Sequence, residues 1–345
     1  MLRALAAFSV VIHHGLETSG GAARKTCPDW ITMAGASGVD IFFVISGFIM
    51  LHVSFGPGRS PPTPVQFLAR RLTRIYPFYW ICCLAILAMS SLGFLSSHHY
   101  RLPMIASSLG LVPGEQLIGV AWTLVYEIYF YILFACTLWL RSASVSLLGT
   151  SGAIVLIYGG SMLVPPNMRS DFLANPLPIE FCLGLGLAYF HTRTVRAGRR
   201  WPVGWSMTFV GLFLLMVAAM VGAHADTAGL LPLPRVLLWG VPAMFVVAGV
   251  LHAGPPRNAV SRIAILLGDA SYAVYLTHVF VMIGYGRLLK ISAVNQLPQM
   301  PWVVAATLLS AAVGVAAHLW IEKPLLAMIR DLIRRRSFHA VPAVI

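Results

Sequence analysis

Apolar residues form long runs along most of this chain, and short polar stretches rich in proline, glycine or arginine separate them. A helix needs about 20 mainly apolar residues to cross about 30 Å of hydrocarbon. The runs therefore predict an all-α protein, a polytopic bundle of about ten transmembrane helices. The expected spans lie near residues 3–17, 35–55, 76–96, 120–140, 144–164, 176–192, 203–223, 234–252, 264–286 and 301–321.

The two ends of the chain differ from the spans between them. The first expected span is short and starts at the very N-terminus, so we expect the natural start to lie a few residues upstream. The last stretch is basic and contains "RDLIRRRSF". The pattern predicts a transmembrane domain over 1–322 and a basic cytoplasmic tail over 323–345.

Composition supports a membrane protein. Hydrophobic residues make up 58% of the chain and charged residues only 10%, whereas soluble domains carry about 25% charged residues. The net charge of +13 does not indicate nucleic-acid binding here, because cytoplasmic loops of membrane proteins are basic. With the N-terminus inside, the expected inner segments hold 17 Lys and Arg residues and the outer segments hold 7. This asymmetry predicts that both termini are cytoplasmic.

Ionisable side chains within spans are costly and usually mark function. The first span contains His13 and His14, and 11 residues separate Arg3 from His14. At 1.5 Å per residue, His14 lies roughly 16 Å from Arg3, about half the hydrocarbon thickness. Adjacent histidines point about 100° apart on a helix, so at most one of them readily faces a given site. The candidate histidines lie on different spans without ligand spacing, so we expect no metal site.

Three further stretches carry candidate chemistry. "FLARRLTRIYP" places Arg71 and Arg74 one turn apart just before the third expected span, and arginine forks suit phosphate groups. "WTLVYEIYFY" embeds Glu127 in aromatic residues, where a carboxylate needs a partner such as a histidine or an arginine. In "LGDASYAVYLTHVF", Tyr272, Tyr275 and His278 are three residues apart and can share one helix face.

These stretches resemble the acyltransferase-3 family of bacterial membrane O-acyltransferases, and they are most similar to its exopolysaccharide-production (ExoZ-like) branch. The matching stretches occur in family order: "LRALAAFSVVIHH", "GVDIFFVISGFIM", "FLARRLTRIYPFYW", "WTLVYEIYFYILFA", "NPLPIEFCLGLGLA", "LGDASYAVYLTHVF" and "WIEKPL". The abbreviated N-terminus and the lack of a fused periplasmic hydrolase-like domain depart from the family pattern. The resemblance implies a multi-pass acyltransferase of the bacterial inner membrane.

The resemblance also implies roles for individual residues. The family's arginine, ten residues, then histidine fall on Arg3 and His14, which implies that His14 is catalytic. Its basic motif falls on Arg71 and Arg74, and its acidic residue on Glu127. We expect Arg3, Arg71 and Arg74 to bind acyl-CoA. The expected acceptor-side residues are Asp40, Trp122, Tyr272, Tyr275 and His278.

The expected reaction transfers acetyl from acetyl-CoA to a sugar hydroxyl of a glycan or lipid-linked oligosaccharide, with no permanently bound cofactor. His14 is expected to act as general base on the acceptor, because imidazole exchanges protons near neutral pH. A covalent acyl-histidine remains an equal alternative. Glu127 is expected either to orient the histidine or to stabilise the positive charge that forms. A proton-coupled membrane transporter or flippase of glycan intermediates is the competing function.

Overall fold

The computed structural model describes residues 1–20, 27–95, 100–168, 170–199, 201–224, 232–251 and 259–339. These residues fold into helices, and they include no strand, which confirms the all-α prediction. The α-helices are α1 (Leu2–Thr18), α3 (Asp29–Ala36), α4 (Gly38–Phe55), α5 (Pro64–Ser91), α6 (Leu102–Gly110), α7 (Trp122–Thr137), α8 (Ala143–Met162), α9 (Ile179–Arg196), α10 (Trp205–His224), α11 (Pro232–Arg235), α12 (Val241–Val250), α13 (Ala259–Asp269), α14 (Ser271–Leu288), α15 (Ser292–Asn295), α16 (Gln299–Ala317) and α17 (Lys323–His339). Short 3₁₀ turns η1 (Gly119–Ala121) and η2 (Leu138–Leu140) and π turns η3 (Val236–Gly240) and η4 (His318–Glu322) adjoin them.

Six helical stretches within the described residues are long and apolar enough to cross a bilayer, or seven if α13 and α14 form one bent span. The six are Asp29–Phe55, Pro64–Ser91, Gly119–Leu140, Ala143–Met162, Trp205–Gly222 and Gln299–Ile333. Helices also occupy the remaining expected ranges, as α1, α9 and the shorter apolar stretch Val236–Val250. The count of ten spans and the cytoplasmic position of the termini stay predictions.

Helix α5 begins well before the span expected over 76–96. Pro64 occupies its first turn, and Thr63 forms a capping box with Gln66. Proline tolerates that position, and the box satisfies backbone donors that have no partner within the helix. The expected boundary was therefore wrong, because it followed the apolar run and ignored the capping signal. Arg71 and Arg74 lie inside a regular helix instead of in a loop before one.

The ninth expected span, 264–286, is two helices and not one. α13 and α14 meet at Ala270 with a bend of 69° between their axes. The backbone of Gly268 approaches the N-terminal amine of Met1, so α13 covers the start of α1. α14 then continues along α1, and the bend thereby brings Ser271 close to the first turn of that helix.

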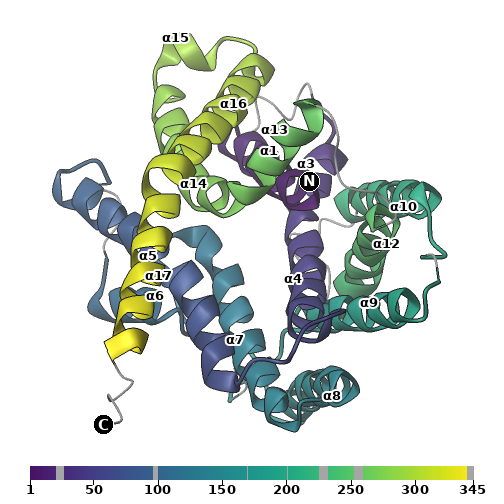
Figure 1. Ribbon diagram of the computed structural model, residues 1–345. Helices are drawn as coiled ribbons and strands as arrows, with labels where there is room; N and C mark the ends of the chain where they lie inside the picture. The colour runs from purple at the N-terminus through teal and green to yellow at the C-terminus, as the bar shows by residue number, and fades with distance from the viewer. Residues whose placement is uncertain are drawn as a thin grey trace.

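Helices α4 and α9 are packed with their backbones in contact. A Cβ at Gly47 would collide with the carbonyl of Phe181, and a Cβ at Gly184 would collide with the carbonyl of Val44. Small residues permit such approaches between helices in membranes. In Figure 1, α10 and α12 lie on one side of α4, and α5 and α17 lie on the other.

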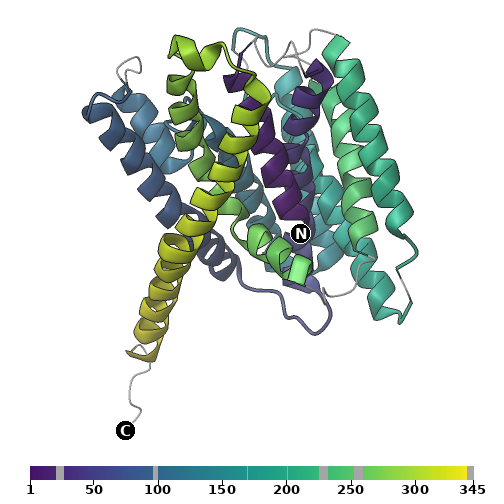
Figure 2. The same ribbon diagram turned by 90° about the horizontal axis from the view of Figure 1, so that it is seen from above.

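Helix α1 occupies the interior of this arrangement. It packs against α3, α4, α13, α14 and α16, and Figure 2 shows it in the middle of the bundle, while α17 extends beyond the other helices. The side chains of Ala6, Ala7, Val10 and Val11 are buried in these contacts. The small, apolar face of α1 therefore fixes where two of its polar residues, Arg3 and His14, point.

Candidate active site

Arg3 and His14 contact the same neighbouring helix, α14. The Nε of Arg3 donates a hydrogen bond to the Oγ of Ser271, at 3.1 Å. Eleven residues further along α1, the ring of His14 stacks on that of His278, with 5.4 Å between centroids and 22° between planes. Because Ser271 and His278 both belong to α14, this helix fixes the two family-signature residues in a defined relation.

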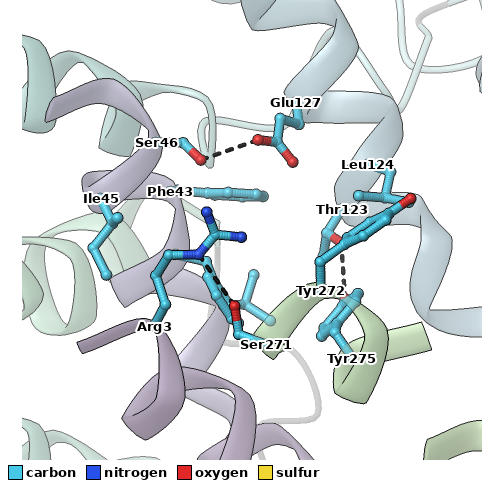
Figure 3. A pocket seen from close by; sticks show the side chains of 12 residues that line it. Arg3, Phe43, Ile45, Ser46, Thr123, Leu124, Glu127, Ser271, Tyr272 and Tyr275 are labelled. Carbon is cyan, nitrogen blue, oxygen red and sulfur yellow. Dashed lines mark hydrogen bonds between the residues drawn. The ribbon is translucent and has the colours of Figure 1, made fainter. Parts of the chain in front are cut away.

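Arg3 lines an inner pocket between α1, α4, α7 and α14, which we call the Arg3 pocket. Its lining residues are Arg3, Val39, Phe42, Phe43, Ile45, Ser46, Thr123, Leu124, Glu127, Ser271, Tyr272 and Tyr275. Figure 3 shows the guanidinium of Arg3 and the carboxylate of Glu127 both directed into this pocket. The cavity volume is about 60 Å³. That volume holds a few water molecules or a small acyl group, since one water needs roughly 10–15 Å³ of such space.

Glu127 is held in place from two sides. The Oγ of Ser46 on α4 donates to its Oε1 at 3.1 Å, and the hydroxyl of Tyr131, one turn along α7, donates to the same oxygen. The carboxylate therefore lies between α4 and α7 and faces Arg3. The sequence suggested a histidine or an arginine as the partner of Glu127, and the structure shows two hydroxyl groups bonded to it.

The carboxylate beside His14 is Glu17, which the sequence reasoning missed. The Nδ1 of His14 donates to the Oε2 of Glu17 at 3.1 Å. That bond leaves Nε2 as the nitrogen with a free lone pair, which is the nitrogen a general base uses. Their spacing of three residues on one helix was a usable signal, because such residues lie on the same face.

His13 belongs to the same small cluster. Its Nδ1 donates to the carbonyl of Thr32 at 2.8 Å, and its Nε2 lies 3.4 Å from the Oε1 of Glu17. The ligand atoms of His13, His14 and Glu17 all lie within 4.8 Å of one another, so the cluster has the donors to hold a metal ion. The expectation of no metal site considered only histidines on separate spans and missed this grouping.

The arginine motif reaches the same interior. Arg71 and Arg74 line a second inner pocket of about 40 Å³ together with Arg3, Glu127 and Tyr131. This pocket adjoins the Arg3 pocket, because Arg3, Ser46, Glu127 and Tyr272 line both. The structure thus brings together all three arginines expected to bind the acyl donor, and it places them around Glu127.

Two of the five expected acceptor-side residues line the Arg3 pocket. The hydroxyl of Tyr272 donates to the carbonyl of Ile75 at 2.7 Å, and that of Tyr275 to the carbonyl of Val120 at 2.8 Å. These bonds hold both rings at the pocket wall. His278 is fully buried behind them, with its ring centroid 5.9 Å from that of Tyr275.

Asp40 and Trp122 lie elsewhere. Asp40 is fully buried and accepts two hydrogen bonds from Arg235, at 3.1 and 3.0 Å. Trp122 is 37% exposed and meets the ring of Tyr126 edge-on. Neither residue lines the Arg3 pocket. The expected role of these two residues on the acceptor side stays a prediction, and the Arg3 pocket gives it no support.

The family of the chain follows from comparison with known sequences. The model of the acyltransferase-3 family, described as "Acyltransferase domain", matches residues 1–320. The chain belongs to this family. It is an acyltransferase, and the family together with its apolar helices indicates a multi-pass membrane protein. The resemblance seen in the sequence is thereby confirmed.

Two curated relatives match over most of their length. The exopolysaccharide production protein ExoZ of Rhizobium meliloti (strain 1021) is 32% identical over 304 residues, which cover 85% of this chain and 90% of the relative. The acyltransferase MdmB of Streptomyces mycarofaciens is 26% identical over 355 aligned residues, which cover 90% of this chain and 85% of the relative. No solved structure matches the chain.

Proposed function

We propose that this enzyme transfers an acetyl group from acetyl-CoA to a sugar hydroxyl of an exopolysaccharide or other cell-surface glycan, in the bacterial inner membrane, with His14 as general base. One observation carries the proposal. α1 places Arg3 in a pocket with Glu127, Arg71 and Arg74, and it places His14 three turns further on, bonded to Glu17 through Nδ1. Helix α1 thus carries Arg3, beside a place for a polyanionic donor, and His14, a proton acceptor, about three turns apart.

The donor side is supported by charge and by size. Arg3, Arg71 and Arg74 supply positive charge beside the inner pockets, which suits an acyl-CoA. The Arg3 pocket, at about 60 Å³, favours a short acyl group over a long chain. Glu127 lines the second inner pocket together with these arginines, so its proposed role is to stabilise positive charge within the pocket and not to orient His14.

The proton step uses the free nitrogen of His14. In the proposed reaction, Nε2 takes the proton of the acceptor hydroxyl, the hydroxyl oxygen attacks the thioester carbonyl, and the carbon–sulfur bond breaks. The proton then passes from His14 to the sulfur of CoA. Tyr275 and His278 lie between the Arg3 pocket and His14, as a row of rings spaced 5.9 and 5.4 Å apart. The proposal therefore requires the thioester and the acceptor hydroxyl to meet beside His14, beyond these rings.

The choice of a glycan rests on relatives. One relative is named for exopolysaccharide production, and it aligns with 85% of this chain. A proton-coupled transporter or flippase was the competing function expected from the sequence; the family disfavours it, although the bundle buries acidic residues such as Asp40 and Glu180. That function requires no acyl transfer by the purified protein, which separates the two possibilities.

The test compares His14 with its neighbour. A host lacking the gene is complemented with wild type, His14→Ala or His13→Ala at equal membrane abundance, and O-acetyl groups on its purified surface polysaccharides are quantified by proton NMR. We expect His14→Ala to remove the acetyl signal, since general-base catalysis contributes about 10²–10⁴-fold. His13→Ala, the matched control, should retain it. Restoration by both variants would exclude His14 as the base, and restoration by none, wild type included, would favour transport or another acceptor.

A further inference from the structure

A basic groove lies outside the inner pockets, between α5, the end of α13 and the helix that runs from η4 into α17. Its charged lining residues are Arg70, Arg74, Lys323, Arg330 and Asp269, and His318 also lines it. The cavity volume is about 460 Å³. Sites for small molecules and cofactors typically have about 300–1,000 Å³, so this groove has the size of a ligand site and the inner pockets do not.

The π turn η4 shapes one wall of this groove. His318 begins this turn, Lys323 follows it directly, and both side chains line the groove. Glu322 turns inward instead. It is fully buried, and its Oε2 accepts a hydrogen bond from the Nδ1 of His318 at 2.7 Å. The dyad fixes the imidazole at the groove wall.

The groove has a net positive charge, which favours an anionic ligand. Its lining contains four arginine and lysine side chains from two helices and one carboxylate, that of Asp269. Like charges held this close repel one another, and a bound anion removes that repulsion. Leu266, Leu319, Leu326 and Ile329 supply apolar walls between the charges. The combination fits a ligand with several phosphates and a flat apolar part.

Arg74 connects this groove to the reaction site. Its side chain lines both the groove and the inner pocket that contains Arg3, Arg71 and Glu127. The groove and the inner pocket therefore adjoin at Arg74, so one extended ligand can occupy both. The expected tail over 323–345 begins as helix α17, which packs against α5 and extends beyond the bundle (Figure 2).

We infer that this groove binds the phosphorylated nucleotide end of the acyl donor, and that Arg70, Lys323 and Arg330 join Arg74 as its phosphate ligands. The inference rests on the proposed function, because it requires an acyl-CoA donor. It assigns the first turns of α17 to donor binding, and it leaves Arg3 and Arg71 for the acyl end.

The experiment measures binding, so it needs no acceptor. The full chain in nanodiscs of phosphatidylcholine is titrated by calorimetry with CoA and with adenosine 3′,5′-bisphosphate, which carries phosphates but no pantetheine arm. We expect wild type to bind both. The double variant Lys323→Gln/Arg330→Gln should bind each at least about tenfold more weakly, because hydrogen bonds to charged groups are strong. Lys290→Gln, an exposed cation beyond the end of α14, is the control and should bind as wild type does.

Each other result has a defined meaning. Equal affinity of wild type and double variant for CoA would overturn the groove inference and leave the proposed function standing. No CoA binding by wild type would overturn both. Discs containing phosphatidylglycerol test lipid headgroups as the source of phosphate. A lipid site would give two results together. The wild type and the double variant would bind CoA with equal affinity in both kinds of disc, and phosphatidylglycerol would raise the melting temperature of the wild type but not that of the double variant. Those results would make the inference wrong.

Discussion

The imidazole of His14 stacks on that of His278, a residue that is fully buried on the neighbouring helix. The Nδ1 of His278 lies 3.3 Å from the carbonyl of Val274 in its own helix, and within the described chain its Nε2 has no hydrogen-bond partner. The visible contact of His278 with the proposed base is therefore the face of its ring. It is a positioning residue in this arrangement.

Replacing His278 separates ring stacking from proton chemistry. We expect His278→Phe to retain more transferase activity than His278→Ala, because phenylalanine preserves the flat ring against His14. His278→Ala removes that ring and leaves a cavity, which costs stability as well as alignment. The measurement is kcat for acetyl transfer by purified protein, with melting temperature as the control for folding. Equal loss in both variants would show that a nitrogen of His278 takes part.

Glu17 is the second positioning residue for His14. Its Oε2 accepts the Nδ1 proton of His14, and this bond selects the tautomer with a basic Nε2. We expect Glu17→Gln to retain most of the activity, because its amide oxygen still accepts that proton, and Glu17→Ala to lose roughly tenfold in kcat. Nearly unchanged KM for acetyl-CoA in both variants distinguishes this role from donor binding. An activity of Glu17→Ala equal to wild type would contradict it.

The cluster of His13, His14 and Glu17 gives a separate prediction about metal. We propose that the reaction proceeds without one, with Glu17 accepting the hydrogen bond from Nδ1 of His14 and Thr32 accepting that from Nδ1 of His13. Dialysis against a chelator should then leave transfer activity unchanged. The check includes metal analysis of the purified protein and re-addition of Zn²⁺. Activity that falls on dialysis and returns with Zn²⁺ would assign these three side chains to a metal site.

Asp40, which is fully buried, forms an ion pair with the partly buried Arg235, with two hydrogen bonds between them. Glu180 lies beside both residues. Removing one partner of such a pair typically costs about 3–5 kcal/mol, because the other charge stays buried and unpaired. We expect Asp40→Asn to lower the unfolding midpoint in micelles strongly and to reduce activity through lost folded protein.

A double replacement provides the control for this pair. Asp40→Leu/Arg235→Met removes both charges, so it should recover part of the stability lost by Asp40→Asn. The coupling between the two positions is then measurable as a double-mutant cycle. If Asp40→Asn instead folds normally and fails only in catalysis, Asp40 has a role at the acceptor after all.

Much of the fold could be predicted from the sequence, because a membrane requires long apolar segments to form helices. Apolar runs must become helices, since the hydrocarbon region offers no partner for free backbone groups, and each expected range does contain a helix. The start of α5 and the bend at Ala270 were missed. Thr63 and Gln66 cap the start of α5, and α13 and α14 are bent by 69° at Ala270; an average of hydropathy detects neither feature.

The candidate site could be predicted from the sequence only in part. The residues of the site could be named from the family's motifs, but their partners lie far away in sequence. Ser46 and Glu127 are 81 residues apart, and Asp40 and Arg235 are 195 residues apart. Such contacts depend on how helices pack, which no local pattern specifies. Glu17 is the exception, because it lies three residues from His14 on the same helix.

Glu127 provides the sharpest test of the Arg3 pocket. Its carboxylate faces Arg3, and the hydroxyls of Ser46 and Tyr131 hold it there. Glu127→Gln keeps the shape of the side chain but removes the negative charge. We expect it to lower kcat at least about a hundredfold, because charge stabilisation inside a buried site is usually among the largest catalytic contributions.

Single loss of either hydroxyl should be milder than loss of the charge. Ser46→Ala and Tyr131→Phe each leave one hydrogen bond to Glu127, so we expect reductions of about tenfold or less in kcat. Removing both should be more damaging than the product of the single effects, because the carboxylate then has no bond to hold it opposite Arg3. A serine that carried the acyl group would give the opposite order, with Ser46→Ala as damaging as Glu127→Gln. Rates of acetyl transfer by the four variants, compared at equal melting temperature, decide between a positioned carboxylate and a serine nucleophile.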